Sequence, residues 1–152
     1  MGYKCFGFKN SRNIGTIGEN LFVKSYPKLN PQKSKNSKYD FKLKDGTTTE
    51  LKTDTYSMDD VENFFMEALS NIKTETLGGP WQAYKNKIDH FVYLFLADKT
   101  FFWFEPKSLC AELNKLIKDL KPVKILNKRY ETLGYKISRI ALKKIIIKEE
   151  AF

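Results

Sequence analysis

Two carboxylates and one amine are closely spaced around an Asp-Gly turn in the first third of the chain. Asp40 is followed, after nine intervening residues, by Glu50, and Lys52 comes two residues later. Carboxylate oxygens bind hard divalent cations, and an ammonium group beside such a cation can hold or activate an attacking water molecule. If the three side chains share one face, the pattern predicts metal-assisted hydrolysis of a phosphodiester.

The residues on both sides of the Asp-Gly dipeptide alternate between apolar and polar types, which is typical of a hairpin with one apolar face. The apolar positions are Tyr39, Phe41, Leu43 and, after the turn, Leu51. We therefore expect two antiparallel strands, at 38–44 and 47–54, joined by a tight turn.

The length of the turn decides which residues face each other. A two-residue turn at 45–46 would set Asp40 opposite Leu51 and send the apolar and polar faces to the wrong sides. A three-residue turn at 44–46, with Gly46 in the left-handed conformation, sets Asp40 directly opposite Glu50. Only the second register keeps the apolar side chains on one face and the polar ones on the other. It places Lys52 next to Glu50 on the polar face.

Like charges directly opposite each other destabilise a sheet, so Asp40 facing Glu50 suggests a cation between them. Mg²⁺ takes oxygen ligands, keeps several waters and typically binds one or two carboxylates plus a substrate phosphate. The backbone carbonyl of Leu51 lies between the two side chains and offers another oxygen. We expect a Mg²⁺ cofactor, for which Mn²⁺ can substitute.

These residues resemble a known nuclease signature. Asp40, nine residues, and then Glu50-Leu51-Lys52 is similar to the motif of the PD-(D/E)XK nuclease superfamily, although Tyr39 stands where the name has proline. The resemblance implies an α/β (α+β) fold with a restriction-endonuclease-like core, in which a mixed β-sheet is flanked by helices. It also implies a metal site built from Asp40 and Glu50, with Lys52 as the catalytic lysine.

The resemblance extends to three further polar residues. A helix that carries an acid ahead of the hairpin, here with Glu19, is similar to the arrangement in Holliday-junction resolvases and phage endonucleases, which implies that Glu19 binds the metal directly or through water. Residues 63–72 and those that follow resemble the later segment of small phage-type nucleases, which makes Glu67 and Gln82 secondary candidates. Gln82 does not begin the Q-x-x-x-Y pattern of RecB-like nucleases, because Asn86 takes the place of the tyrosine.

Other elements must hold these residues in place. A helix is predicted within 13–26, beginning at Thr16, where Glu19 would complete a capping box; this is an alternative to metal contact for Glu19. Residues 63–72 fit both helical and strand spacing, and the resemblance favours a strand. We further expect a short helix beginning near Pro80, a hairpin of central strands at 90–96 and 100–105, a helix at 106–121, and a final strand or mixed element at 135–147. Residues expected to face the core include Ile17, Leu21, Trp81, Tyr84, Ile88 and Leu120.

The charge of the chain favours an acidic partner. The formal net charge is +9, and lysine outnumbers arginine by 24 to three. Lysine contacts phosphate as a point charge, whereas arginine reads base edges, so the excess favours contact with the backbone of DNA, duplex or branched. A lysine-biased genome explains the excess equally well. An exposed basic loop is predicted at 27–38, and the candidate phosphate-binding residues are Lys24, Lys28, Lys33, Lys35 and Lys38.

Length and composition limit the remaining possibilities. The 152 residues suit one domain, 1–152, with the basic loop inserted before the hairpin. The longest apolar runs are too short to span a bilayer, so no membrane partner is expected. Cys5, Cys110 and the lone His90 fit neither a zinc site nor a disulfide framework. We therefore expect a cytoplasmic protein with reduced, structural cysteines.

These observations predict a Mg²⁺-dependent DNA endonuclease. Few arginines and no evident base-reading module favour recognition of DNA structure, as in a Holliday-junction or branched-DNA resolvase. Paired cuts need two sites, which suggests a homodimer. Two alternatives stay open: a sequence-specific endonuclease of the restriction or homing type, and a non-catalytic, basic nucleic-acid-binding protein.

Overall fold

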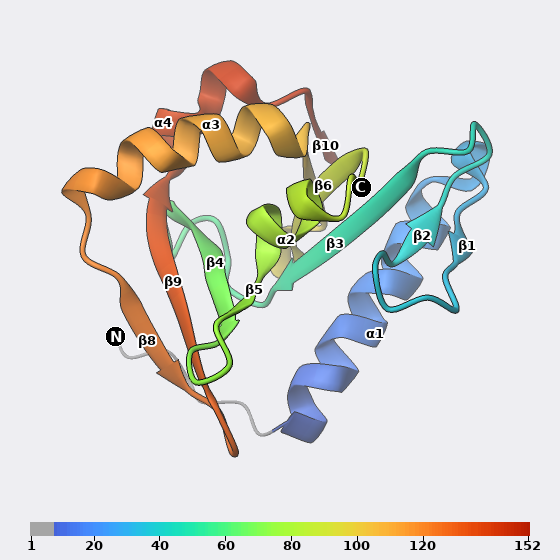
Figure 1. The fold of residues 1–152 in the computed structure, drawn as a ribbon. Helices are drawn as coiled ribbons and strands as arrows, with labels where there is room; N and C mark the ends of the chain where they lie inside the picture. Colours follow the sequence, from blue (N-terminus) through green and yellow to red (C-terminus); the bar gives the residue numbers. More distant parts are fainter. Residues whose placement is uncertain (1–7) are drawn as a thin grey trace.

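Two β-sheets and four α-helices make up the α+β fold of this protein, of which the computed structural model describes residues 8–152 (Figure 1). The larger sheet contains β1 (Gln32–Lys33), β2 (Phe41–Lys42), β3 (Thr48–Asp54), β6 (His90–Phe95), β7 (Thr100–Phe104) and β10 (Lys148–Ala151), in that order across the sheet. The smaller sheet has the order β5 (Thr76–Leu77), β4 (Asn63–Asn71), β9 (Glu131–Ser138) and β8 (Val123–Leu126). The helices are α1 (Phe8–Ser25), α2 (Gly79–Lys85), α3 (Pro106–Leu116) and α4 (Arg139–Leu142), with single 3-10 turns at Pro27–Leu29, Leu96–Asp98, Ile117–Asp119 and Lys143–Ile145.

The larger sheet is mixed, as expected, because β3 runs parallel to β6 while its other neighbouring strands pair antiparallel. A crossover connection is needed between two parallel strands, and here β4, β5 and α2 lie in it. The chain therefore leaves the larger sheet at the end of β3, builds part of the smaller sheet, and returns at β6.

The continuous apolar runs of β6 and β7 are explained by burial on both faces of the larger sheet. One face packs against α1, through a core of Phe22, Tyr26, Phe41, Leu43, Val92, Leu94, Phe101 and Trp103. The opposite face packs against α2, α3 and the smaller sheet, through a core that includes Phe64, Met66, Phe91, Tyr93, Phe95, Phe102, Leu109, Leu113 and Ile137. The predicted central hairpin and flanking helices are confirmed.

The first helix begins earlier than the sequence predicts. Because α1 already starts at Phe8, Thr16 lies inside it, and the expected capping box between Thr16 and Glu19 is wrong. Glycine inside a helix is normally unfavourable, yet Gly18 has a packing role here. A Cβ at Gly18 would lie 2.0 Å from Oγ1 of Thr53 on β3, so glycine permits the close approach of α1 to β3.

Several predictions of inward-facing side chains are also wrong. Ile17 is 52% exposed and Tyr84 is 50% exposed, while Leu120 lies at the surface beyond α3. Tyr39 was expected on the same face as Phe41, but it packs against the opposite core. Ile17 lies on the outer side of the long helix α1. The other three side chains lie near or beyond the end of an element, where a small error of register changes the face that a side chain occupies.

The strand predicted at 63–72 is confirmed as β4, but it does not join the sheet that carries the hairpin. It pairs with β5 and β9 in the smaller sheet instead. The region 135–147 is mixed, since β9 ends at Ser138 and is followed by α4 and a 3-10 turn. Within residues 8–152, no helix has the length and apolar character required to cross a membrane.

Candidate functional site

The turn of the β2–β3 hairpin has the three-residue form that the sequence predicts. The amide of Leu43 donates a hydrogen bond to the carbonyl of Thr47 at 2.8 Å. Gly46 has a φ of +87°, in the left-handed region where a side chain would be strained. The turn therefore fixes the register of the two strands.

This register brings Asp40 and Glu50 together at the edge of β3. Phe41 lies opposite Thr49, and continuing the ladder by one residue places Asp40 opposite Glu50. Strand β2 is only two residues long, and beyond it the amide of Leu51 donates to Asp40 Oδ2 at 2.8 Å instead of to a strand partner. The N–H and C=O of one strand residue point toward the same neighbour, so the Leu51 carbonyl also faces this open edge.

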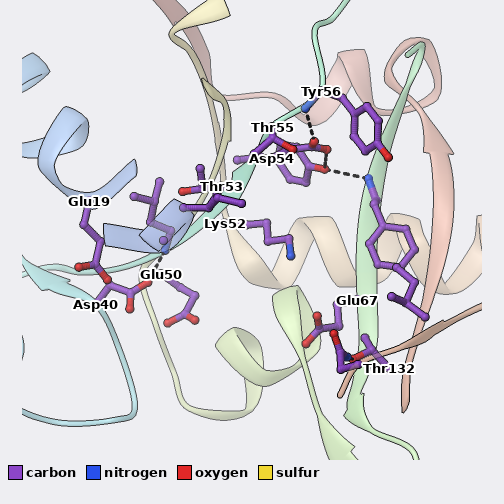
Figure 2. Close-up of a pocket in the computed structure, with 17 residues that line it drawn as sticks. Glu19, Asp40, Glu50, Lys52, Thr53, Asp54, Thr55, Tyr56, Glu67 and Thr132 are labelled. Carbon is purple, nitrogen blue, oxygen red and sulfur yellow. Dashed lines mark hydrogen bonds between the residues drawn. The ribbon is translucent and has the colours of Figure 1, made fainter. Parts of the chain in front are cut away.

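Glu50, Lys52 and Asp54 alternate along β3 and line a cavity of about 380 Å³ that lies between the two sheets (Figure 2). Leu51 packs instead with the core beneath α1, and Thr53 lies against Gly18 of that helix. The polar face of β3 is thus directed toward the smaller sheet, and its other face holds α1 in place.

Glu19 reaches the same place from α1. Figure 2 shows its carboxylate beside that of Asp40, and both residues line the cavity. Lys33 Nζ, on β1, forms an ion pair with Glu19 Oε2 at 2.7 Å, and the hydrogen bond and charge of Glu19 raise the pKa of Lys33. Lys33 is therefore engaged with the acidic cluster, whereas it was predicted only as a phosphate contact.

The carboxyl groups hold protons more tightly than isolated ones do. Burial, together with the charge of Glu19, raises the pKa of Asp40 to about 6, while the hydrogen bond from Leu51 opposes this rise. Burial, followed by the charges of Asp40, Glu67 and Glu19, raises the pKa of Glu50 to about 8. The cluster is thus short of positive charge, which a divalent cation would supply.

Lys52 extends from β3 into the space between Glu50 and Glu67 (Figure 2). Its ammonium group makes no hydrogen bond or ion pair with residues 13–152, whose side chains are described, so it is available to water or to a phosphate oxygen. Burial raises the pKa of Glu67, and the charge of Lys52 opposes that rise. Lys52 therefore lies between two acids that come from different sheets.

The two secondary candidates also lie at the site. Glu67 on β4 fits against the start of α2 because Gly78 and Gly79 leave room for it. A Cβ added to Gly78 would lie 2.5 Å from Oε1 of Glu67, and a Cβ added to Gly79 would lie 2.7 Å from the Glu67 carbonyl oxygen. Gln82 on α2 lines a smaller cavity of about 140 Å³, together with Glu50, Lys52 and Glu67. The structure brings both candidates close to the hairpin without assigning either a role.

Asp54, by contrast, has a structural role. It accepts hydrogen bonds from the Tyr93 hydroxyl and from the Tyr56 amide at 2.9 Å. The same hydroxyl accepts a bond from the Phe65 amide at 3.0 Å, so this network joins β3 and β6 to β4.

The donor set suits a cation that keeps much of its own water. Among residues 8–152, no group of three or more His, Cys, Asp or Glu side chains forms a ready-made metal site. Mg²⁺ does not need one, because one or two carboxylates with waters and a phosphate commonly complete its coordination. Asp40, Glu50 and the carbonyl of Leu51 match that requirement.

Part of the predicted basic loop forms regular secondary structure. It contains a 3-10 turn at Pro27–Leu29 and the two-residue strand β1, and the Ser34 amide donates to the Asp40 carbonyl at 2.8 Å. This bond ties the loop to the residue that begins the candidate site. The remaining candidate phosphate contacts are exposed; they are Lys24, Lys28, Lys35 and Lys38.

Sequence reasoning missed the part of the site that the smaller sheet supplies. Ile125, Asn127 and Thr132 line the cavity opposite β3. They lie more than 70 residues after Lys52 in the chain, and no local pattern connects them to the hairpin. Only the pairing of β9 with β4, and of β8 with β9, brings them there.

The other residues considered for chemistry are placed in the core. Cys110 is free and buried, and burial raises the pKa of its thiol to about 12, which makes it unreactive. Cys5 lies outside the described residues. The His90 ring stacks edge-on against Trp103, and burial lowers its pKa.

Comparison of the chain with models of protein families and with curated proteins finds no match. A functional assignment therefore depends on the arrangement of side chains described above.

Proposed function

We propose that this protein is a metal-dependent DNA endonuclease that hydrolyses phosphodiester bonds. The observation that carries the proposal is the convergence of Asp40, Glu50 and Lys52 at the edge of β3, beside an open cavity. Two facing carboxylates destabilise a sheet unless a cation lies between them, so their position favours a role in metal binding.

Each residue has a distinct role in this proposal. Asp40 and Glu50 would hold the metal with the carbonyl of Leu51, and Glu19, which now pairs with Lys33, would join them directly or through water. A bound Mg²⁺ supplies a Lewis acid and lowers the pKa of its water. The ammonium of Lys52 orients the attacking water and offsets the negative charge that develops on the phosphorus oxygens.

The candidate phosphate contacts of the basic loop and the end of α1, namely Lys24, Lys28, Lys35 and Lys38, hold the phosphate backbone and make binding strongly dependent on salt. With three arginines in the chain, we infer recognition of DNA structure, as in a branched-DNA resolvase. Cleavage of both strands at a junction then requires a homodimer, because one chain offers one such site. A cytoplasmic location belongs to the same proposal.

The test is a cleavage assay on supercoiled plasmid, a synthetic four-way junction and linear duplex, each with Mg²⁺, Ca²⁺ or a chelator. The wild-type protein should nick or cut with Mg²⁺ and remain inactive with chelator. Asp40→Asn, Glu50→Gln and Lys52→Ala should each reduce the cleavage rate by about 100-fold or more, because each removes a group that acts on the reacting atoms. DNA binding in Ca²⁺ should largely survive.

Matched controls separate chemistry from charge. Asp60→Asn removes an exposed acid near β4 and Lys42→Ala removes an exposed lysine of β2, so both should cleave like the wild type. Unaltered cleavage by Glu50→Gln and Lys52→Ala would contradict the proposal and leave a non-catalytic nucleic-acid-binding protein. Discrete fragments from linear duplex, with no preference for the junction, would point to a sequence-specific endonuclease.

A further inference from the structure

The cavity beside the candidate site extends well beyond the residues that the reaction needs. It has a volume of about 380 Å³ and runs from Glu50 and Lys52 on β3 to Ile125 and Asn127 at β8. Volumes of a few hundred Å³ are typical of sites that enclose a small organic ligand. The space is thus large enough for one building block of a polymer and too small for a folded partner.

Charge is distributed unevenly along this cavity. Among the described residues that line it, Lys52 is the only lysine or arginine, and it lies at the end next to Glu50. The neutral end is formed by Ile125, Asn127 and Thr132 of the smaller sheet, while the acidic side chains that also line the cavity are Glu19, Asp40, Glu50, Asp54 and Glu67. With a divalent cation at Asp40 and Glu50, as proposed above, a ligand that follows this distribution carries its phosphate at the cation and Lys52 and a neutral group at the neutral end.

The neutral end offers a fixed hydrogen-bond acceptor. Asn127 Nδ2 donates to Thr132 Oγ1 at 2.9 Å, and that hydroxyl donates to the Ser70 carbonyl at 3.1 Å. This chain of bonds fixes the side-chain amide of Asn127 and leaves its Oδ1 without a hydrogen-bond partner among residues 13–152, whose side chains the structure describes. An amide oxygen beside the aliphatic Ile125 suits the N–H groups and flat face of a nucleobase.

We propose that this cavity binds the sugar and base of one unpaired nucleotide whose phosphate lies on the metal ion proposed at Asp40 and Glu50. This inference rests on the proposed function and deepens it by naming the substrate class. Bases inside an intact duplex are paired and stacked, so a base fills the cavity only from a single strand or after extrusion. The preferred substrate is therefore DNA with an unpaired nucleotide at the cut, as at a branch point.

Small esters test the inference without any need to know the cut position. A thymidine p-nitrophenyl phosphodiester and methyl p-nitrophenyl phosphate share one leaving group, and only the first carries a nucleoside. With Mn²⁺, the wild-type kcat/KM should be about tenfold or more higher for the thymidine ester. Ile125→Trp, which fills the neutral end, should abolish this preference by lowering kcat/KM for the thymidine ester about tenfold or more.

Binding provides a readout that is independent of turnover. In Ca²⁺, thymidine monophosphate should raise the Tm of the wild-type protein, and inorganic phosphate at the same concentration should not. Ile125→Trp and Asn127→Leu should both lose the rise caused by the nucleotide. Lys124→Trp is the matched control, because Lys124 precedes Ile125 on β8 and is exposed to solvent; it should behave like the wild type.

The outcomes separate the inference from the proposed function. Equal kcat/KM for the two esters would overturn the nucleotide site while the hydrolase survives. If neither ester nor any DNA is hydrolysed, the proposed function fails, and the thermal shift alone decides whether the cavity binds a nucleotide. An absent shift with thymidine monophosphate, or a shift that persists in Ile125→Trp, would overturn the inference.

Discussion

At the scale of single residues, Glu50 is the group whose surroundings are least compatible with its charge. Its carboxyl is half-buried beside Asp40 and faces Glu67 across the cavity, and its pKa rises to about 8. Glu50 must lose its proton to bind a metal, but its surroundings oppose that loss. The protonation of Glu50 therefore affects both the stability of the fold and the affinity for a metal.

The stability of the metal-free protein should fall as the pH rises from about 5 to 8. Between the ordinary pKa of 4.5 and the raised value of about 8, the folded protein holds a proton on Glu50 that the unfolded chain has released. Raising the pH through this window therefore favours unfolding. Glu50→Gln should make the stability depend less on pH. It should increase the free energy of unfolding at pH 8 by about 2 kcal/mol, which corresponds to a rise in Tm of about 4–8 °C.

Thermal melts at pH 5.5 and pH 8, with and without Mg²⁺, measure this effect. Mg²⁺ should raise the Tm of the wild-type protein more at pH 8 than at pH 5.5, because binding requires the ionised carboxylates. Glu50→Gln should show little response to the metal at either pH. A stability that rises between pH 5.5 and pH 8 in the absence of metal would contradict this account of Glu50.

At the scale of elements, the position of the site depends on how closely α1 approaches β3. Gly18 allows contact with Thr53, and the next residue, Glu19, is thereby brought beside Asp40. The alternation in the sequence was enough to predict the hairpin, its turn and its register, because these are local properties of strands and glycine. The start of α1 was not predictable in the same way. In the sequence, a glycine that allows close packing inside a helix cannot be told apart from a glycine that ends one.

Gly18→Ala should destabilise the protein and impair the proposed cleavage, because the added methyl group would overlap Thr53. Overpacking of this kind typically costs about 1–3 kcal/mol, and it would move Glu19 away from the acidic pair. Gly15→Ala is the control within the same helix, since a Cβ there would meet nothing within 4 Å. It should stabilise the protein by about 0.5–1 kcal/mol. Urea unfolding and the plasmid assay measure both effects, and equal behaviour of the two variants would refute this role for Gly18.

At the scale of the whole molecule, the site is formed between two sheets, and this was the least predictable feature. The sequence identified β4 as a strand and Glu67 as a candidate, yet it placed a single mixed sheet around the hairpin. Strand patterns show which residues are buried, but they do not show which strands pair when the partners are distant in the chain. The residues of β8 and β9 that complete the cavity therefore emerge only from the structure.

The hydroxyl of Tyr93 connects the sheets beneath the site. It accepts a bond from the Phe65 amide of the smaller sheet and donates one to Asp54 of the larger sheet. Tyr93→Phe keeps the buried ring and removes both bonds, so it should lower the free energy of unfolding by about 1–3 kcal/mol. Tyr84→Phe, at an exposed ring, should have almost no effect. Denaturant titration monitored by fluorescence checks both, and a neutral Tyr93→Phe would show that other contacts join the sheets.

The two margins of the larger sheet also limit how copies of the protein can associate. One margin is the two-residue β1, and the other is β10, where Lys148, Glu149 and Glu150 stand in succession. Very short strands and charged strands are poor templates for edge-to-edge pairing, which protects a β-protein against fibril growth. Extending this sheet from one molecule into the next is therefore disfavoured, and a dimer able to make paired cuts would have to be built through helices or the smaller sheet.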